Sequence, residues 1–269
     1  ADQIVPVNLP EADYELYYNG FCNKTMWPLC HSMPEYSELR EEYWTAYKRV
    51  NRLFADMVIH TLVKSFKENP KKEHTIWIHD YHLLLAASMI RKKMHELGNT
   101  RKYLLTFFLH VPFPSYEMFR ILPWGEKVLK GVLSCHMVGF HVEDYCYNFL
   151  ECCERLCKFR VNRHKMLVEN DVGEIVSVNA LPISIPFKHF EELATSNPDE
   201  PFRHFKNDGI KVIFGAGRLD YTKGVIQKLK GFKTLLETHP EHLEKVVFVQ
   251  IGVPTRTDVS DYGELKRQV

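Results

Sequence analysis

Three apolar runs separated by helix-like segments constrain the fold more than any other feature of this chain. Residues 75–79, 102–110 and 136–141 are strongly apolar and have the length and composition of β-strands. Residues 83–97 and 124–134, which lie between them, have the apolar spacing of helices. Strands that are apolar throughout and alternate with helices are typical of a parallel sheet covered on both faces. The sequence therefore predicts an α/β fold.

Polar side chains stand where two of these runs end. The first run is followed by Asp80 and His82, and the second ends at His110. In open parallel sheets, ligands bind beyond the carboxyl ends of the strands. This position favours a functional role for Asp80 and His110 over a purely structural one. Whether His82 supports Asp80 or contacts a ligand itself stays open at this point.

A glycine-rich stretch, residues 214–224, predicts a second site. Residues 210–214 have strand character, residues 225–237 have helical spacing, and the turn between them carries Arg218 and Lys223. Backbone N–H groups and the positive end of a helix dipole converge at such a turn, so it suits a phosphate. The alternative is an ordinary connecting loop with two solvated basic side chains. Gly215 and Gly217 lack the third glycine of a dinucleotide-binding fingerprint.

Charge and cysteine content exclude several classes of partner. The 35 basic and 34 acidic residues give a net charge of +1, so no overall field attracts nucleic acid or a membrane surface. The sequence has no apolar run of transmembrane length and no signal-peptide pattern at its start. The seven cysteines are odd in number and lack zinc-ligand spacing. We therefore interpret the cysteines as buried thiols of a protein in a reducing, cytoplasmic setting.

The composition of two segments predicts irregular structure at the start of the chain and a domain boundary further along it. Residues 1–36 are rich in Pro, Tyr and Asn and are expected to be irregular, so that Tyr18 and Trp27 lie in a loop as core aromatics or as the wall of a sugar site. Within residues 181–186 two prolines bracket a short apolar run, which places a first domain at 1–185 and a second at 186–269. The second has only two convincing strands, fewer than an open α/β sheet needs. We therefore expect an internal fragment of a longer protein.

Five stretches together resemble the trehalose-6-phosphate synthases, which form glycosyltransferase family 20. They span nearly the whole chain in the family's order: Tyr18–Pro28, Trp77–His82, Phe107–Pro114, Arg218–Gly224 and Val253–Val259. The resemblance implies a GT-B-like α/β fold with two Rossmann-like parallel-sheet domains facing across a cleft. It also implies transfer of glucose from UDP-glucose to glucose 6-phosphate with retention of configuration, and neither cofactor nor catalytic metal.

The resemblance also implies roles for individual residues. Arg218 and Lys223 match the pair that holds the donor diphosphate, and Asp80 and His110 match groups at the reaction centre. The glucose 6-phosphate site would be formed by four residues: Tyr18, Trp27, Asp80 and Arg256. Cations at the diphosphate would stabilise the charge that develops on the leaving UDP.

Two family features have no counterpart in these 269 residues. The N-terminal glycine-rich loop with its arginine would precede Ala1, and an acidic motif would follow Val269. We therefore expect the chain alone to turn over little or no substrate. A regulatory, sugar-phosphate-sensing member of the family is the alternative function, and another glycosyltransferase or phosphorylase is a further one. The possible partners are a second copy or a larger synthase/phosphatase assembly.

Overall fold

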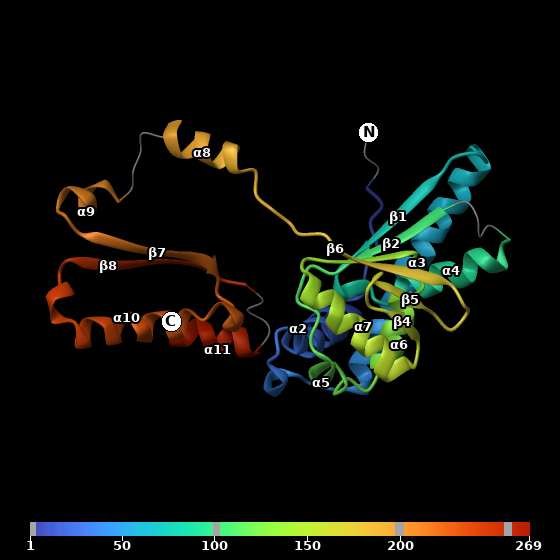
Figure 1. Ribbon diagram of the computed structural model, residues 1–269, viewed down its shortest axis with the longest axis horizontal. Coiled ribbons are helices and arrows are strands. Elements are labelled where there is room, and N and C mark those ends of the chain that lie inside the picture. The colour runs from blue at the N-terminus through green and yellow to red at the C-terminus, as the bar shows by residue number, and fades with distance from the viewer. Residues whose placement is uncertain (1–3, 99–102, 197–201, 256–259) are drawn as a thin grey trace. The chain divides into compact units, whose positions relative to one another are not determined.

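The chain forms two compact units, residues 1–183 and 184–269, in the computed structural model (Figure 1). The structure describes residues 4–98, 103–196, 202–255 and 260–269. The expected boundary, after residue 185, lies in the extended segment that leads to helix α8 (Phe187–Ser196).

The first unit contains a six-stranded mixed sheet with the order β1-β2-β3-β6-β5-β4. Strands β1 (His74–His79), β2 (Tyr103–Phe108), β3 (Met137–Phe140) and β6 (Ile175–Ala180) run parallel to one another. The three predicted apolar strands are therefore confirmed. Strands β5 (Leu167–Glu169) and β4 (Arg160–Asn162) add an antiparallel extension. Strands β5 and β6 form a hairpin, and β4 pairs with the outer side of β5.

One face of this sheet packs on helices. Ile78, Leu105 and Phe107 are buried there. The covering layer consists of α3 (Glu41–Glu68), α4 (Ala86–Glu96), α6 (Gly125–Val132) and α7 (Glu143–Cys157). On the opposite face Trp77 is 58% exposed and Leu104 is 45% exposed. On that same face Thr106 and Phe108 are buried. Among the described residues the opposite face of the sheet is therefore covered in part, and the expectation of cover on both faces holds only there.

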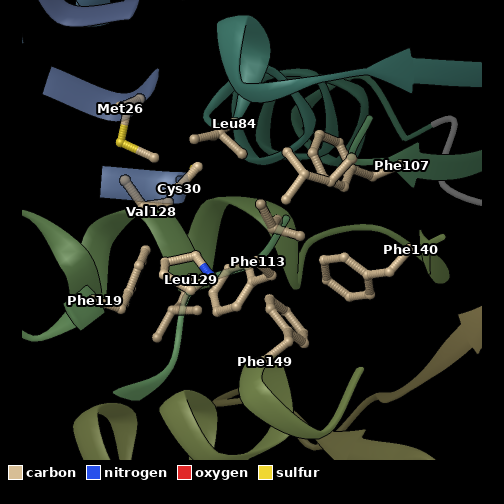
Figure 2. A pocket seen from close by; sticks show the side chains of 13 residues that line it. Met26, Cys30, Leu84, Phe107, Phe113, Phe119, Val128, Leu129, Phe140 and Phe149 are labelled. Atoms are coloured by element: carbon tan, nitrogen blue, oxygen red, sulfur yellow. The ribbon is translucent and has the colours of Figure 1, made fainter. Parts of the chain in front are cut away.

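Aromatic rings form the core between the sheet and these helices (Figure 2). Phe113 lies with its ring centroid 5.0 Å from that of Phe119 and 5.2 Å from that of Phe149, and Phe149 lies 5.2 Å from Phe140. The void that these side chains enclose has a volume of about 10 Å³, no more than one water molecule needs. This cavity is a packing defect of the core and not a ligand site.

Residues 11–30 are helical and not irregular, which corrects the sequence-based expectation for this part of the segment before α3. It consists of α1 (Glu11–Tyr14), a twelve-residue π-helix η1 (Glu15–Met26) and α2 (Trp27–Cys30). A π-helix closes i→i+5 hydrogen bonds, so its buried positions do not recur at the 3.6-residue spacing used to recognise helices. Gly20 allows η1 to lie directly on α3, because a Cβ there would lie 2.6 Å from the ring of Tyr43.

The second unit contains a parallel pair of strands, β7 (Lys211–Arg218) and β8 (Val246–Val253). Helix α10 (Val225–Thr238) connects them, and α9 (Arg203–Asn207) and α11 (Ser260–Gln268) flank the pair in the chain. Strand β7 continues through both glycines to Arg218, whereas the sequence suggested a turn after Phe214.

None of the helices described is both long and apolar enough to cross a membrane.

Candidate substrate-binding site

Asp80 stands at the carboxyl end of β1 with an unusual backbone conformation. Its N–H donates to the carbonyl of Phe108 at 2.7 Å, which continues the ladder between β1 and β2. Its φ is 70° and its ψ is 171°, a region that glycine adopts readily and other residues rarely adopt. The Oδ1 atom of Asp80 accepts a hydrogen bond of 3.2 Å from the backbone N–H of His110. The two predicted residues therefore meet at one edge of the sheet.

Three histidines gather around this edge. The Nδ1 atom of His79 lies 2.9 Å from the Nε2 atom of His110, so one ring donates and the other accepts. The ring of His141, which follows β3, lies 5.9 Å from that of His110. Burial, and next the neighbouring His110, lowers the pKa of His79, so its ring is neutral at physiological pH. The sequence argument missed His79 and His141, although the strand-end rule applied to the third strand would have selected His141.

Tyr18 and Trp27 both approach the turn that follows Asp80. The ring of Tyr18 stacks on that of His82 at 5.8 Å and an angle of 14°. Trp27 is only 6% exposed, and its ring centroid lies 6.0 Å from that of Tyr81. The two residues are nine positions apart, which would place them on opposite faces of an α-helix of 3.6 residues per turn. Tyr18 belongs to the π-helix η1 and Trp27 follows it directly. Because a π-helix closes wider turns than an α-helix, this spacing no longer puts the two residues on opposite faces.

His82 belongs to the same turn. Its Nδ1 atom lies 3.8 Å from the Oδ2 atom of Asp80, beyond hydrogen-bond distance. Its backbone carbonyl accepts hydrogen bonds from the Tyr17 hydroxyl at 3.0 Å and the Asn51 side chain at 3.1 Å. The position of His82 is therefore fixed through its backbone.

The second unit presents Arg218 and Lys223 on either side of a buried aspartate. Arg218 ends β7, and Lys223 ends the short 3₁₀ turn Tyr221–Lys223. Between them Asp220 is 0% exposed, and its Oδ1 atom accepts from the Thr222 N–H at 2.9 Å and the Thr222 hydroxyl at 2.8 Å. Its Oδ2 atom lies 3.9 Å from the Nη2 atom of Arg218. The turn is therefore held by its own carboxylate.

Gly224 connects this turn to helix α10. It has a φ of 62° and a ψ of 36°, the left-handed conformation that glycine adopts at least cost, and it is the N-cap of the helix. The N-terminus of α10 begins directly after Lys223. Two cationic side chains and a helix N-terminus therefore lie within one short segment, an arrangement that attracts an oxyanion.

Arg256 lies outside the described residues. Within the described ranges, no group of three His, Cys, Asp or Glu side chains is arranged to hold a metal ion.

Comparison with known proteins extends these observations. The family model for glycosyltransferase family 20 matches residues 2–269. The UDP-forming α,α-trehalose-phosphate synthase of Botryotinia fuckeliana is 40% identical over 268 residues, which cover 98% of this chain and 49% of that protein. The chain therefore spans about half the length of the curated relatives it matches.

Solved structures have the same fold. A structure described as trehalose-6-phosphate from E. coli bound with UDP-2-fluoro glucose superposes with a TM-score of 0.85 at 31% identity, covering 97% of this chain and 55% of that one. The synthase of Burkholderia xenovorans in complex with glucose-6-phosphate gives a TM-score of 0.84 at 28% identity, covering 96% and 54%. The predicted GT-B-like α/β fold is confirmed. The chain belongs to glycosyltransferase family 20.

Proposed function

We propose that the protein carrying this chain is a retaining glucosyltransferase that converts UDP-glucose and glucose 6-phosphate to trehalose 6-phosphate and UDP. In the proposed reaction, the anomeric hydroxyl oxygen of glucose 6-phosphate bonds to C1 of the donor glucose. The bond from C1 to the diphosphate oxygen breaks on the same face of the sugar. The proton of the attacking hydroxyl passes to the departing diphosphate.

The first unit, with the domain taken as residues 1–185, would bind the acceptor. We assign Asp80 and His110 to the reaction centre, and Tyr18, Trp27 and Arg256 together with Asp80 to glucose 6-phosphate. One observation carries the proposal: Asp80 holds a backbone conformation that costs free energy, at a strand end where His110 fixes its carboxylate. Strained residues of this kind cluster at active sites and ligand-binding positions.

The second unit, taken as residues 186–269, would bind the nucleotide sugar. Arg218 and Lys223 would hold its diphosphate and stabilise the charge that develops as UDP leaves. Support comes from the buried Asp220, which holds the turn between the two cations, and from the helix N-terminus at Gly224. The structural relatives bound to a UDP-glucose analogue and to glucose-6-phosphate support the same two substrates.

UDP release tests this function. The full-length protein should release UDP from UDP-glucose much faster with glucose 6-phosphate than without it. Lys223→Ala should raise the KM for UDP-glucose and lower kcat, whereas Lys228→Ala, on the exposed side of α10, should change neither. Arg256→Ala should raise the KM for glucose 6-phosphate far more than that for UDP-glucose, since a charged hydrogen bond is worth about 2–5 kcal/mol.

Two outcomes would replace this proposal. Glucose 6-phosphate binding without UDP release would indicate the regulatory, sugar-phosphate-sensing alternative. UDP release that is equally fast with an unphosphorylated acceptor or with phosphate would indicate another glycosyltransferase or a phosphorylase.

We also propose a cytoplasmic location and assembly with a second copy or with synthase and phosphatase subunits. All seven cysteines are free thiols, which suits a reducing compartment. Fractionation of cells and the mass of the native protein in solution test these two proposals.

A further inference from the structure

Two buried residues of α3 hold the turn that follows Asp80. We propose that Asn51 and Tyr47 are positioning residues, which keep Asp80 in its strained conformation and so aim its carboxylate at the substrate edge of the sheet. This inference rests on the proposed function for its catalytic consequence, but its structural part does not.

The strain is local to Asp80. With φ at 70° and ψ at 171°, its Cβ occupies space that only glycine leaves free. Two backbone hydrogen bonds fix the peptide groups around it: its N–H donates to Phe108 at 2.7 Å, and its carbonyl accepts from Leu83 at 3.3 Å. A conformation of this kind persists only when the surrounding structure determines it more strongly than the residue itself does.

Asn51 is one of the residues that hold this turn in place. It is 0% exposed, and its amide nitrogen donates to the carbonyl of His82 at 3.1 Å and to that of Tyr47 at 3.0 Å. Its amide oxygen accepts from the N–H of Leu85 at 3.1 Å. One side chain therefore connects both ends of the turn to α3.

Tyr47 holds the two remaining positions. Its hydroxyl, also in a fully buried residue, donates to the carbonyl of Tyr81 at 2.8 Å and accepts from the N–H of Leu84 at 2.9 Å. The backbone of residues 81, 82, 84 and 85 is thus bonded to two side chains of α3. In the part of the chain that the structure describes, neither side chain hydrogen-bonds Asp80 itself.

The arrangement explains why polar groups are buried at this depth. A free turn would let Asp80 return to an ordinary conformation and carry its carboxylate away from His110. Because four backbone groups of the turn are hydrogen-bonded to side chains of α3, that relaxation would break several buried hydrogen bonds at once. Each polar group released in this way would stay buried without a partner.

The first test measures the strain. Asp80→Gly and Asp80→Ala both remove the carboxylate, but only glycine tolerates the backbone conformation. An unstrained site would make the alanine variant more stable. Here we expect the glycine variant to be more stable, with an unfolding equilibrium constant about tenfold lower in urea titrations followed by tryptophan fluorescence. Equal stability, or a more stable alanine variant, would overturn the inference.

The second test couples the strain to α3. Asn51→Ala should destabilise the protein more in the Asp80→Gly background than in the natural sequence, because only the natural sequence regains strain energy when the turn relaxes. If the effects of the two substitutions on stability are additive, Asn51 only pairs the backbone groups of the turn and does not maintain the strain at Asp80. Where Asn51→Ala does not fold, the same cycle is made with Tyr47→Phe, which removes a single hydroxyl.

The third test measures catalysis in the full-length protein. Tyr47→Phe should lower kcat severalfold with little change in the KM for UDP-glucose, and Tyr43→Phe serves as the control. Tyr43 lies on the same helix, but its hydroxyl bonds Glu38 and not the turn. An unchanged kcat for Tyr47→Phe would refute the positioning role. Absence of UDP release from the natural protein, with the first two tests positive, would refute the proposed function and leave the strain intact.

Discussion

Replacement of Gly131 by alanine tests how tightly the turn after Asp80 is enclosed. Gly131 lies in α6, and a Cβ at this position would lie 2.5 Å from the carbonyl oxygen of Leu84 and 3.3 Å from the Cα atom of Leu85. Both are backbone atoms of the turn that Asn51 and Tyr47 hold from the side of α3. The new methyl group therefore cannot be accommodated by rotation of a side chain.

The expected cost follows from two opposing contributions. Overpacking of a well-packed core costs about 1–3 kcal/mol. Replacing a helical glycine by alanine stabilises the helix by roughly 0.5–1 kcal/mol, because alanine loses less backbone entropy on folding. Because the obstacle is backbone on a turn with little freedom, we expect Gly131→Ala to lower the free energy of unfolding by about 1–2 kcal/mol. The displaced turn should also reduce kcat in the full-length protein.

Urea unfolding followed by tryptophan fluorescence measures this cost, because all four tryptophans lie in residues 1–183 and report that unit alone. Gly231→Ala is the matched control: it lies in α10, and a Cβ there meets no atom within 4 Å. This control should leave the fluorescence transition unchanged and should stabilise the second unit by roughly 0.5–1 kcal/mol in circular dichroism. A Gly131→Ala variant as stable as the natural chain would refute the reasoning.

Three further predictions concern charge, reactivity and backbone conformation. The guanidinium of Arg49, through its hydrogen bonds with Asp13, holds the pKa of that carboxyl below its ordinary value. The stability that this pair contributes is therefore full above the unfolded pKa and lost as the pH falls through the folded one. Arg49→Gln should lower the urea midpoint at pH 7 and have a vanishing effect at acid pH; an equal loss at both would contradict the pairing. Burial raises the pKa of the Cys135 thiol to about 12, so mass spectrometry should find it unalkylated by iodoacetamide at pH 8 in the folded chain and alkylated in urea. Rapid labelling of the folded chain would show that this thiol is accessible. Gly224→Ala forces a side chain into a φ of 62°, so it should cost about 1–2 kcal/mol and weaken UDP-glucose binding measured by calorimetry, whereas undiminished affinity would argue against the turn as the diphosphate site.

The strands of the candidate site were predictable because their signal is local. An apolar run such as residues 75–79 identifies itself, and the strand-end rule then locates Asp80 and His110 without any knowledge of packing. The contact between these two residues follows from the pairing of β1 with β2, since neighbouring parallel strands end at the same edge.

Other features depend on contacts between distant residues and could not be predicted. The π-helix Glu15–Met26 lacks the spacing by which helices are recognised, and its packing against Tyr43 explains the need for Gly20. The extension of β7 to Arg218 depends on its pairing with β8 over eight residues. Local propensity favours a turn at the two glycines, and strand pairing overrides it.

The sequence by itself determined the α/β class, the family and the identity of the polar groups at the strand ends, because these depend on residue type and spacing along the chain. Only the tertiary structure decided how those groups are held. The strain at Asp80, the hydrogen bonds from Asn51 and Tyr47, and the approach of Tyr18 and Trp27 to the same turn arise between elements that are distant in sequence. Their free energy depends on distances that only the folded chain defines.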